Sequence, residues 1–453
     1  MNLPEPFTNR IRLQWPGSAQ AFFRALETAP PVSIRLNPAK PSSPFPGLPV
    51  PWCKTGLYLA ERPSFTGDPL FHAGCYYVQE AASMFLEQAL QMFLPKEPCL
   101  ALDVCAAPGG KSTHLLSLLP EGSLLVSNEV IHSRAMVLKE NLLKWGAPGL
   151  VISSSDPRDF SRLSEQFDLL LVDAPCSGEG LFRKEPMAIR EWSPAGAEAC
   201  SLHQQRMLDD CIPLLKEGGL LIYSTCTYNP AENEAQVERL RTLGFTCLPL
   251  RFDAVDPANA PVPVPVGSGQ AYRFLPPFTR GEGLFLSILR KEKTIDRPVT
   301  SPEKKAPGDK TAFQEWPESS RVSPWMKRPE TFRILRFQDQ LFAVSAAHES
   351  FIRQLQQSVS VLYAGVELAT LKNEKLIPAH GLALSVAMNP DPFPRIPLTR
   401  EQAVQYLKKE TFPLPMVKKG WAVVTYEGHS LGWIHQLENR FNNNYPTGWR
   451  IRL

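Results

Sequence analysis

Two cysteine residues stand directly after sequences that are typical of buried strands. Cys176 follows the apolar run 169–172 and Asp173, and Cys226 follows the apolar run 220–223. Four-residue apolar runs bounded by Asp, Gly or Pro predict strands of a parallel sheet that is buried on both faces. Ligands of open α/β sheets collect outside the carboxyl ends of such strands. Two thiols and the Asp173 carboxylate at that edge could therefore carry out covalent chemistry.

The alternative is that both thiols are core residues, because free cysteine is among the most buried residue types. A single isolated cysteine would favour that alternative. Here polar and turn residues flank both positions, with Ser177-Gly178 after the first cysteine and Thr227 after the second. We therefore interpret Cys176 and Cys226 as reactive site residues.

Alternating strands and helices must position these loops, and that alternation predicts βαβ units with a parallel sheet. Asn229 is expected to cap the last helix, with Pro230 in its first turn and Glu232 at the third position. A late strand at 284–289 could join the same sheet after a proline-rich loop at 257–277. The other expected strands are 100–105, 123–128, 149–153, 168–173 and 219–224, and the helices are 111–119, 132–145, 203–216 and 230–243.

Composition sets outer bounds on the protein. At 453 residues, with 43% apolar and 21% charged side chains, the chain predicts a soluble globular protein of about two to four domains. The net charge of +3 gives no global positive field, so any nucleic-acid surface must be local. The nine cysteines contain no CxxC pair, no apolar stretch is long enough to span a membrane, and the composition leads us to expect no secretory leader. We expect reduced thiols, a cytoplasmic location, no membrane partner and no metal site.

A glycine-containing loop follows the first predicted strand, in the run Cys105-Ala106-Ala107-Pro108-Gly109-Gly110-Lys111. Glycines at a strand-to-helix turn let the backbone approach a ligand and expose helix amides. A P-loop would need glycine at position 105, and the dinucleotide pattern is absent because Ala107 precedes Gly109 by two residues. Glu129, at the end of the second strand, is placed where an acidic side chain would meet ribose hydroxyls. The loop predicts a nucleoside-bearing cofactor, with a purely structural turn as the alternative.

With the cysteine loops added, the chain resembles the RNA (cytosine-5)-methyltransferases of the RsmF/RsmB and Nop2/Sun family. The region after about 326 resembles the RsmF branch, although Thr447 stands where that branch has lysine and Ala369 where it has glycine. Runs that carry the resemblance are 76–84, 105–111, 173–180, 224–227 and 281–285, with 365–368, 378–384 and 444–446 in the C-terminal region.

The resemblance implies an α/β protein whose core is a Rossmann-like class I methyltransferase sheet. An N-terminal RNA-binding α+β segment is expected before the core, and C-terminal α+β and β-barrel (PUA-like) modules after it. The expected boundaries are 1–95 for the N-terminal segment, 96–292 for the core, 293–325 for a linker, 326–390 for the first C-terminal module and 391–453 for the PUA-like module.

Residue roles follow from the same resemblance. Cys226 is expected to attack C6 of cytosine, Cys176 to resolve the adduct, and Asp173 to hydrogen-bond the pyrimidine at N3. S-adenosylmethionine is the expected methyl donor, with its ribose at Glu129 and its adenine near Asp156. Lys111 and Asp156 have surface and turn roles as alternatives. The cofactor-binding set comprises Cys105, Ala106, Ala107, Pro108, Gly109, Gly110, Lys111, Glu129, Arg134, Asp156 and Asp173.

The expected substrate is 16S rRNA, within the small ribosomal subunit, and the protein is expected to act as a monomer. A tRNA or large-subunit rRNA methyltransferase and a non-catalytic assembly factor are the alternatives. Arg35, Lys40 and the pair Arg183-Lys184 are candidate phosphate contacts. A chain ending near residue 292 is expected to keep the whole sheet and the cofactor site while losing RNA affinity.

Overall fold

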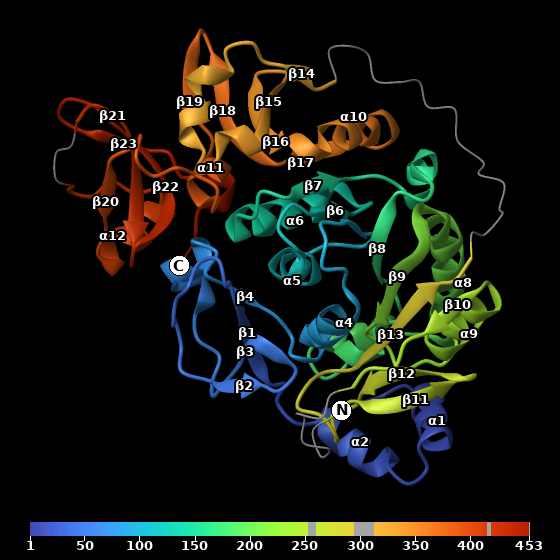
Figure 1. Ribbon diagram of the computed structural model, residues 1–453. Helices are drawn as coiled ribbons and strands as arrows, with labels where there is room; N and C mark the ends of the chain where they lie inside the picture. The colour runs from blue at the N-terminus through green and yellow to red at the C-terminus, as the bar shows by residue number, and fades with distance from the viewer. Residues whose placement is uncertain (252–259, 294–311, 415–417, 453) are drawn as a thin grey trace.

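The computed structural model describes residues 1–251, 260–293, 312–414 and 418–452 (Figure 1). Within these residues the largest sheet has ten strands, nine of them in the order β11-β12-β13-β9-β8-β5-β6-β7-β17, with β10 paired to β13. The strands are β5 Leu100–Asp103, β6 Leu124–Asn128, β7 Leu150–Ser153, β8 Phe167–Asp173, β9 Leu215–Thr225, β10 Phe245–Cys247, β11 Val262–Val266, β12 Gly269–Phe274, β13 Leu284–Lys291 and β17 Val361–Ala364.

The five central strands, β9-β8-β5-β6-β7, are all parallel, as the alternating pattern predicts. Strand β5 lies between β8 and β6, so consecutive βα units wind away from it in opposite directions. This is the topological switch point at which open α/β sheets bind their ligands. The loops after β5, β8 and β9, which contain the glycine pair and both cysteines, all leave this edge of the sheet.

Both faces of the sheet are covered, which explains the continuous apolar runs. Leu170, Val172 and Leu221 face a cluster that includes residues of α6 His132–Trp145, α8 Pro194–Cys211 and α9 Glu234–Thr242. The alternate residues Leu169 and Leu171 face a second cluster with α4 Leu86–Phe93 and α5 Gly110–Leu118. Alternation along each strand thus places successive side chains in two different cores.

Some predicted elements differ from the observed ones. Helix α8 begins at Pro194 instead of 203, with Ser193 accepting a hydrogen bond from the Gly196 amide. The expected loop 257–277 contains the hairpin β11–β12, apart from residues 257–259, which lie outside the described residues. Two of its prolines, Pro263 and Pro265, lie in β11, the strand at one end of the sheet, where a missing N–H is tolerated.

The N-terminal region forms its own four-stranded sheet in the order β2-β3-β1-β4. Helices α1 and α2 lie beside the β11–β12 hairpin (Figure 1), where Phe7 and Phe22 pack with Phe182 and Tyr228. This packing ties the N-terminal helices to both cysteine loops. The elements are α1 Glu5–Gln14, α2 Ala19–Leu26, β1 Val32–Leu36, β2 Leu48–Val50, β3 Cys53–Leu59, α3 Pro69–His72 and β4 Tyr76–Val78.

The C-terminal region contains a five-stranded sheet, β14-β15-β16-β18-β19, and a four-stranded sheet, β20-β21-β22-β23. The hairpin β21–β22 turns at Glu427-Gly428, as predicted. The first sheet comprises β14 Gln314–Glu315, β15 Phe332–Phe337, β16 Gln340–Ser345, β18 Val366–Lys372 and β19 Lys375–Pro378, accompanied by α10 Glu349–Ser358 and α11 His380–Leu384. The second comprises β20 Arg395–Pro397, α12 Arg400–Lys408, β21 Gly420–Tyr426, β22 His429–Gln436 and β23 Phe441–Asn443.

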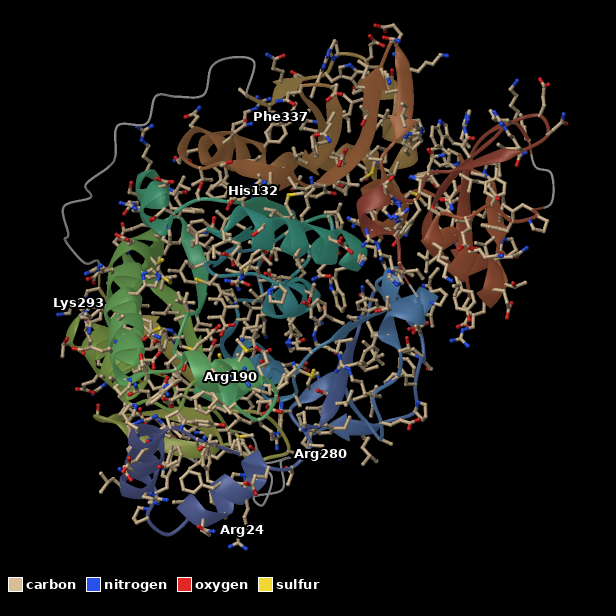
Figure 2. The ribbon with its side chains drawn as sticks, turned by 180° about the vertical axis from the view of Figure 1, so that it is seen from behind. Arg24, His132, Arg190, Arg280, Lys293 and Phe337 are labelled. Carbon is tan, nitrogen blue, oxygen red and sulfur yellow. The ribbon has the colours of Figure 1, made fainter. Side chains whose placement is uncertain are left out.

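The expectation that the whole central sheet precedes residue 292 is wrong. Strand β17 comes from beyond that point and pairs antiparallel with β7, with Val361 opposite Ser153. Figure 2 shows this module, marked by Phe337, against the side of the core that carries α6, marked by His132. Residues 294–311 of the expected linker lie outside the described residues, but 312–325 are packed, with Phe313, Trp316 and Val322 buried. The residues of β17 and their sequence neighbours do not indicate that the strand pairs with β7, which lies far away in the chain.

The last four-stranded sheet packs against the N-terminal sheet, and the C-terminus lies beside that sheet (Figure 1). Ile34 and Tyr76 of the N-terminal sheet share one apolar cluster with Tyr406 and Tyr445. His429 Nε2 also lies 3.0 Å from the Pro41 carbonyl oxygen. Among the described residues, no helix is both long and apolar enough to cross a membrane.

Candidate active site and cofactor pocket

The two cysteines meet at the carboxyl edge of the central sheet. Strands β8 and β9 are parallel neighbours with Asp173 opposite Ser224, so the loops that follow them start side by side. The Sγ atoms of Cys176 and Cys226 lie 3.3 Å apart and share a hydrogen bond, although the residues are 50 positions apart in the sequence. Both side chains are half-buried, whereas Cys53, Cys75, Cys99, Cys211 and Cys247 are buried.

The Cys176 thiol is held in its protonated form. Its hydrogen bond with Cys226 and its burial raise the pKa of Cys176 well above the ordinary range, and the nearby Glu232 carboxylate adds to the effect. A protonated Cys176 can donate its hydrogen to Cys226, which stabilises negative charge on the Cys226 sulfur. The arrangement therefore makes the surroundings of Cys176 unfavourable for its ionisation.

The 3.3 Å separation makes the pair oxidisable. Treatment of the reduced, RNA-free protein with diamide is expected to join Cys176 to Cys226 through a disulfide, because little movement is needed to bring the sulfurs to bonding distance. Peptide mapping under non-reducing conditions would detect the linked peptides, and Cys176→Ser provides the control without a partner. Disulfides formed only between other cysteines would contradict the described geometry.

Asp173 connects the cysteine loops to the glycine loop. Its two carboxylate oxygens accept hydrogen bonds from Ser224 Oγ and from Lys111 Nζ, each at 2.7 Å. Burial alone would lower the pKa of Lys111, but the adjacent Asp173 carboxylate outweighs burial and the pKa is raised. The Lys111 ammonium is thus a permanent positive charge beside Asp173, instead of the surface lysine that was the alternative.

The glycine loop turns sharply between β5 and α5. Gly109 has a φ of +110°, a left-handed conformation that favours glycine, and an added Cβ would lie 3.2 Å from Leu138. The loop is fixed to α6 because Arg134 Nη2 donates to the Ala107 carbonyl at 3.0 Å. Arg134 also lies 3.5 Å from the Glu129 carboxylate. These contacts join three of the expected cofactor residues into one rigid unit.

A cavity of about 880 Å³ lies beside this loop. Of the expected cofactor residues, Cys105, Glu129, Arg134 and Asp156 line it. Residues 106–111 and Asp173 are not among the lining residues; Ala106, Ala107 and Gly109 are buried, and Pro108 is exposed. Asp156 also begins the following 3₁₀ turn, where its side chain accepts from the Arg158 amide. The structure therefore combines the turn role and a cavity position for this residue.

Sequence reasoning missed a second wall of the cavity. It comes from α8, which contributes His203, Arg206, Met207 and Asp210. Their spacing of three, one and three residues places them on one helix face, and polar residues grouped on such a face were the available signal. Val130 and Ile131 also line the cavity, although these apolar residues are 56% and 50% exposed. Exposed apolar side chains at a cavity mouth suit a flat aromatic ring.

The expected phosphate contacts are mostly structural. Arg35 is fully buried and donates to Gln79 and Thr113, and Lys40 donates to the carbonyls of Ala73 and Lys144. These two predictions are wrong, because each cation binds acceptors inside the protein and cannot reach RNA. The prediction that Arg183 contacts phosphate is also wrong.

The Arg183 guanidinium forms an ion pair with Glu282 at 3.0 Å, and both side chains are only 5% exposed. Lys184, the next residue, is exposed and remains a candidate.

One group of metal-ligand side chains occurs within the described residues, away from the cavity. Cys53, Glu87 and His114 are buried together, and His114 Nε2 lies 3.1 Å from Glu87 Oε2 and 3.9 Å from Cys53 Sγ. Glu87 also accepts from the Lys54 amide. Burial and the nearby Arg35 lower the pKa of His114 to about 4, so the ring is neutral. Hydrogen bonding accounts for this group without an ion.

The chain is similar to known methyltransferases in sequence and in fold. A family model described as 16S rRNA methyltransferase RsmB/F matches residues 90–290. Models of the RsmF N-terminal domain and the RsmF PUA domain match 3–81 and 393–451. The crystal structure of a methyltransferase homolog protein from Pyrococcus horikoshii is 29% identical, with a TM-score of 0.54 over 64% of this chain and 95% of that chain. The fold is therefore a Rossmann-like methyltransferase fold with a C-terminal PUA domain.

Near-full-length relatives give a narrower assignment. Ribosomal RNA small subunit methyltransferase F of Shewanella sp. (strain MR-4) is 31% identical over 98% of this chain and 97% of its own length. The protein of that name from Enterobacter sp. (strain 638) is 29% identical over 98% and 95%. The chain belongs to the family of ribosomal RNA small subunit methyltransferases F. It is an S-adenosylmethionine-dependent methyltransferase, as the sequence predicts.

Proposed function

We propose that this protein transfers a methyl group from S-adenosylmethionine to C5 of cytosine in 16S rRNA through a covalent bond between Cys226 and C6. The observation that carries the proposal is the contact of the Cys176 and Cys226 thiols beside Asp173, at the switch point of the sheet and next to a cavity. The small-subunit target is taken from the names of the relatives and from the family model that spans the core.

The residues present fit S-adenosylmethionine, which supplies an electrophilic methyl group when bound. Glu129 lines the cavity at the end of β6, where its carboxylate can accept from ribose hydroxyls. Val130 and Ile131 offer apolar contact for the adenine, with Asp156 as a polar neighbour. Lys111 and Asp173 form an ion pair at 2.7 Å, which joins the loop after β5 to the end of β8.

Thiol addition solves the chemical difficulty of the reaction. C5 of cytosine is a poor nucleophile, and addition of the Cys226 thiolate at C6 moves an electron pair to C5, which then takes the methyl group. Asp173, held by Ser224 and Lys111, accepts a hydrogen bond from N3 once N3 takes a proton from solvent, and that proton neutralises the charge that develops on N3 on addition. Transfer of the C5 proton to water re-forms the C5–C6 double bond and expels Cys226 as a thiolate. Cys176, in contact with Cys226, assists that last step.

The cytosine must leave its stack to reach Cys226, at a cost of a few kcal/mol. Unpaired nucleotides in loops and junctions lower this cost, and they are also the RNA that proteins recognise by sequence. The PUA domain and the N-terminal segment are the parts proposed to select such a site.

Mapping of 5-methylcytosine in rRNA and tRNA, from cells with and without the gene, tests the proposal. Loss of a 5-methylcytosine from 16S rRNA alone is expected, and the purified protein should restore it in deficient small subunits or in naked 16S rRNA. Loss confined to tRNA or large-subunit rRNA would replace the substrate by one of those RNAs. Unchanged methylation, together with defective subunit assembly, would indicate the non-catalytic factor.

Cys176→Ala is expected to trap the reaction. Because the thiol that resolves the adduct differs from the thiol that forms it, the variant should accumulate a protein–RNA complex that survives denaturation, dependent on S-adenosylmethionine. Denaturing gels with radiolabelled RNA measure this complex, and Cys226→Ala in the same gels should give none. Normal turnover without a retained complex would remove the resolving role from Cys176.

A further inference from the structure

Residues 230–233, which the sequence predicts to form the first turn of α9, precede the observed helix. The helix begins at Glu234, and the two residues before it, Glu232 and Asn233, are completely buried between the two cysteine loops. Buried polar side chains are retained where their hydrogen bonds are satisfied, so the partners of this dipeptide indicate what it does.

Glu232 holds the Cys176 loop. Its carboxylate accepts from the Ser177 amide at 2.8 Å and from Ser177 Oγ at 2.5 Å, directly beside Cys176. Gln204 Nε2 donates to Glu232 at 3.3 Å and to the Pro175 carbonyl at 2.9 Å. The residues on both sides of Cys176 are thereby held by the Glu232 carboxylate and the Gln204 amide, which contact each other.

Asn233 holds the Cys226 loop in the same way. Its Oδ1 accepts from Thr225 Oγ1 at 2.5 Å, and its Nδ2 donates to the Thr227 carbonyl at 2.9 Å. These are the residues immediately before and after Cys226. The two loops are also joined directly, because the Oγ of Ser177 and the Oγ1 of Thr227 are hydrogen-bonded at 2.8 Å.

We propose that Glu232 and Asn233 are positioning residues that hold the two cysteine loops in one geometry, so that the Cys176 and Cys226 thiols stay in contact. The proposal rests on the catalytic roles given to these thiols above. Glu232 and Asn233 are covalently joined neighbours, and each of them holds one cysteine loop. The fixed length of a dipeptide therefore limits the distance between the two loops. Small misplacement of reacting groups costs rate steeply, which gives such a clamp a large effect.

The negative charge of Glu232 adds an electrostatic effect on Cys176. After the hydrogen bond to Cys226 and burial, the charge on Glu232 contributes to raising the pKa of Cys176. Other titratable groups interact electrostatically with this pair: Tyr223 of β9 with Cys176, and Glu179 and Cys200 with Glu232. Removal of the Glu232 charge alone should therefore lower the pKa of Cys176 without opening the loops.

Glu232→Ala and Glu232→Gln separate the two effects, and Glu234→Gln is the matched control. Glu234 is two residues further along and pairs with Arg273, so its variant removes one charge without touching either cysteine loop. Each protein is assayed for kcat and KM with rRNA, for the pH profile of kcat, and for S-adenosylmethionine binding. The rate of diamide-induced Cys176–Cys226 disulfide formation, measured without RNA, reports the loop geometry independently of catalysis.

Glu232→Ala is expected to lower kcat about a hundredfold with little change in KM, and to slow disulfide formation. Glu232→Gln has nearly the same shape and can still accept from the Ser177 amide, so it should recover most of both rates. Its pH profile should differ, with the limb that reports Cys176 moved to lower pH. Glu234→Gln should match the unmodified protein in every assay.

Unchanged kcat and unchanged disulfide formation in Glu232→Ala would overturn the positioning role. An unchanged pH profile in Glu232→Gln would overturn the electrostatic part, and this variant serves even if the alanine protein does not fold. Slowed disulfide formation in Glu232→Ala, combined with full methyl transfer by Cys226→Ala, would leave the clamp standing and refute the proposed chemistry instead.

Discussion

Cys226→Ala is expected to abolish methyl transfer while S-adenosylmethionine still binds. The variant removes the group that is proposed to add to C6, and loss of a covalent nucleophile can reduce kcat by on the order of 10⁶-fold. The cofactor site is left intact, because Cys226 is not among the residues that line the cavity. Transfer of labelled methyl groups to rRNA and calorimetric binding of S-adenosylmethionine provide the two measurements.

Cys200→Ala is the control for this variant, because Cys200 is a half-buried thiol of α8 outside both cysteine loops. It should retain methyl transfer. Substantial 5-methylcytosine formation by Cys226→Ala would move the nucleophile to Cys176, whose thiol lies 3.3 Å away.

A chain that ends at residue 292 is expected not to fold, in contrast to the expectation from the sequence. It lacks β17, which covers the edge strand β7, and it lacks Phe351, whose ring lies 5.7 Å from that of Phe167. Phe342, Ile352 and Leu355 belong to the same core as the parallel strands. The missing side chains would expose that core along a whole edge of the sheet. The truncated chain should therefore show no cooperative thermal unfolding and should not bind S-adenosylmethionine.

A single substitution in the full chain measures the same contact on a smaller scale. Phe351→Ala should lower the free energy of unfolding by about 3–5 kcal/mol, the usual cost of emptying a buried aromatic site. Urea denaturation followed by fluorescence gives the value, and Phe278→Ala, at a side chain that is 38% exposed, should change it little. For the chain that ends at residue 292, cooperative unfolding and S-adenosylmethionine binding as tight as that of the full chain would contradict the expectation that it does not fold.

The sequence alone determined which edge of the sheet carries the candidate site. Apolar runs of four residues marked β8 and β9, and the rule that ligands collect at carboxyl ends brought Asp173, Cys176 and Cys226 to one place. Glu129 and the glycine loop followed from the same rule. These features are local in the chain, because strand patterning and the loops after strands are encoded within about ten residues.

Tertiary structure decided the features that depend on partners far along the chain. Arg35, Lys40 and Arg183 are cations of the kind that bind RNA phosphates. In the fold, however, they are buried and bind acceptors inside the protein. Strand β17 joins the sheet more than 200 residues after β7, and Glu232 turns away from its helix to hold Ser177. A charged side chain or a short strand is compatible with many environments, and its sequence neighbours do not identify the group that binds it. Its role is therefore settled by packing and by the pairing of polar groups that burial requires.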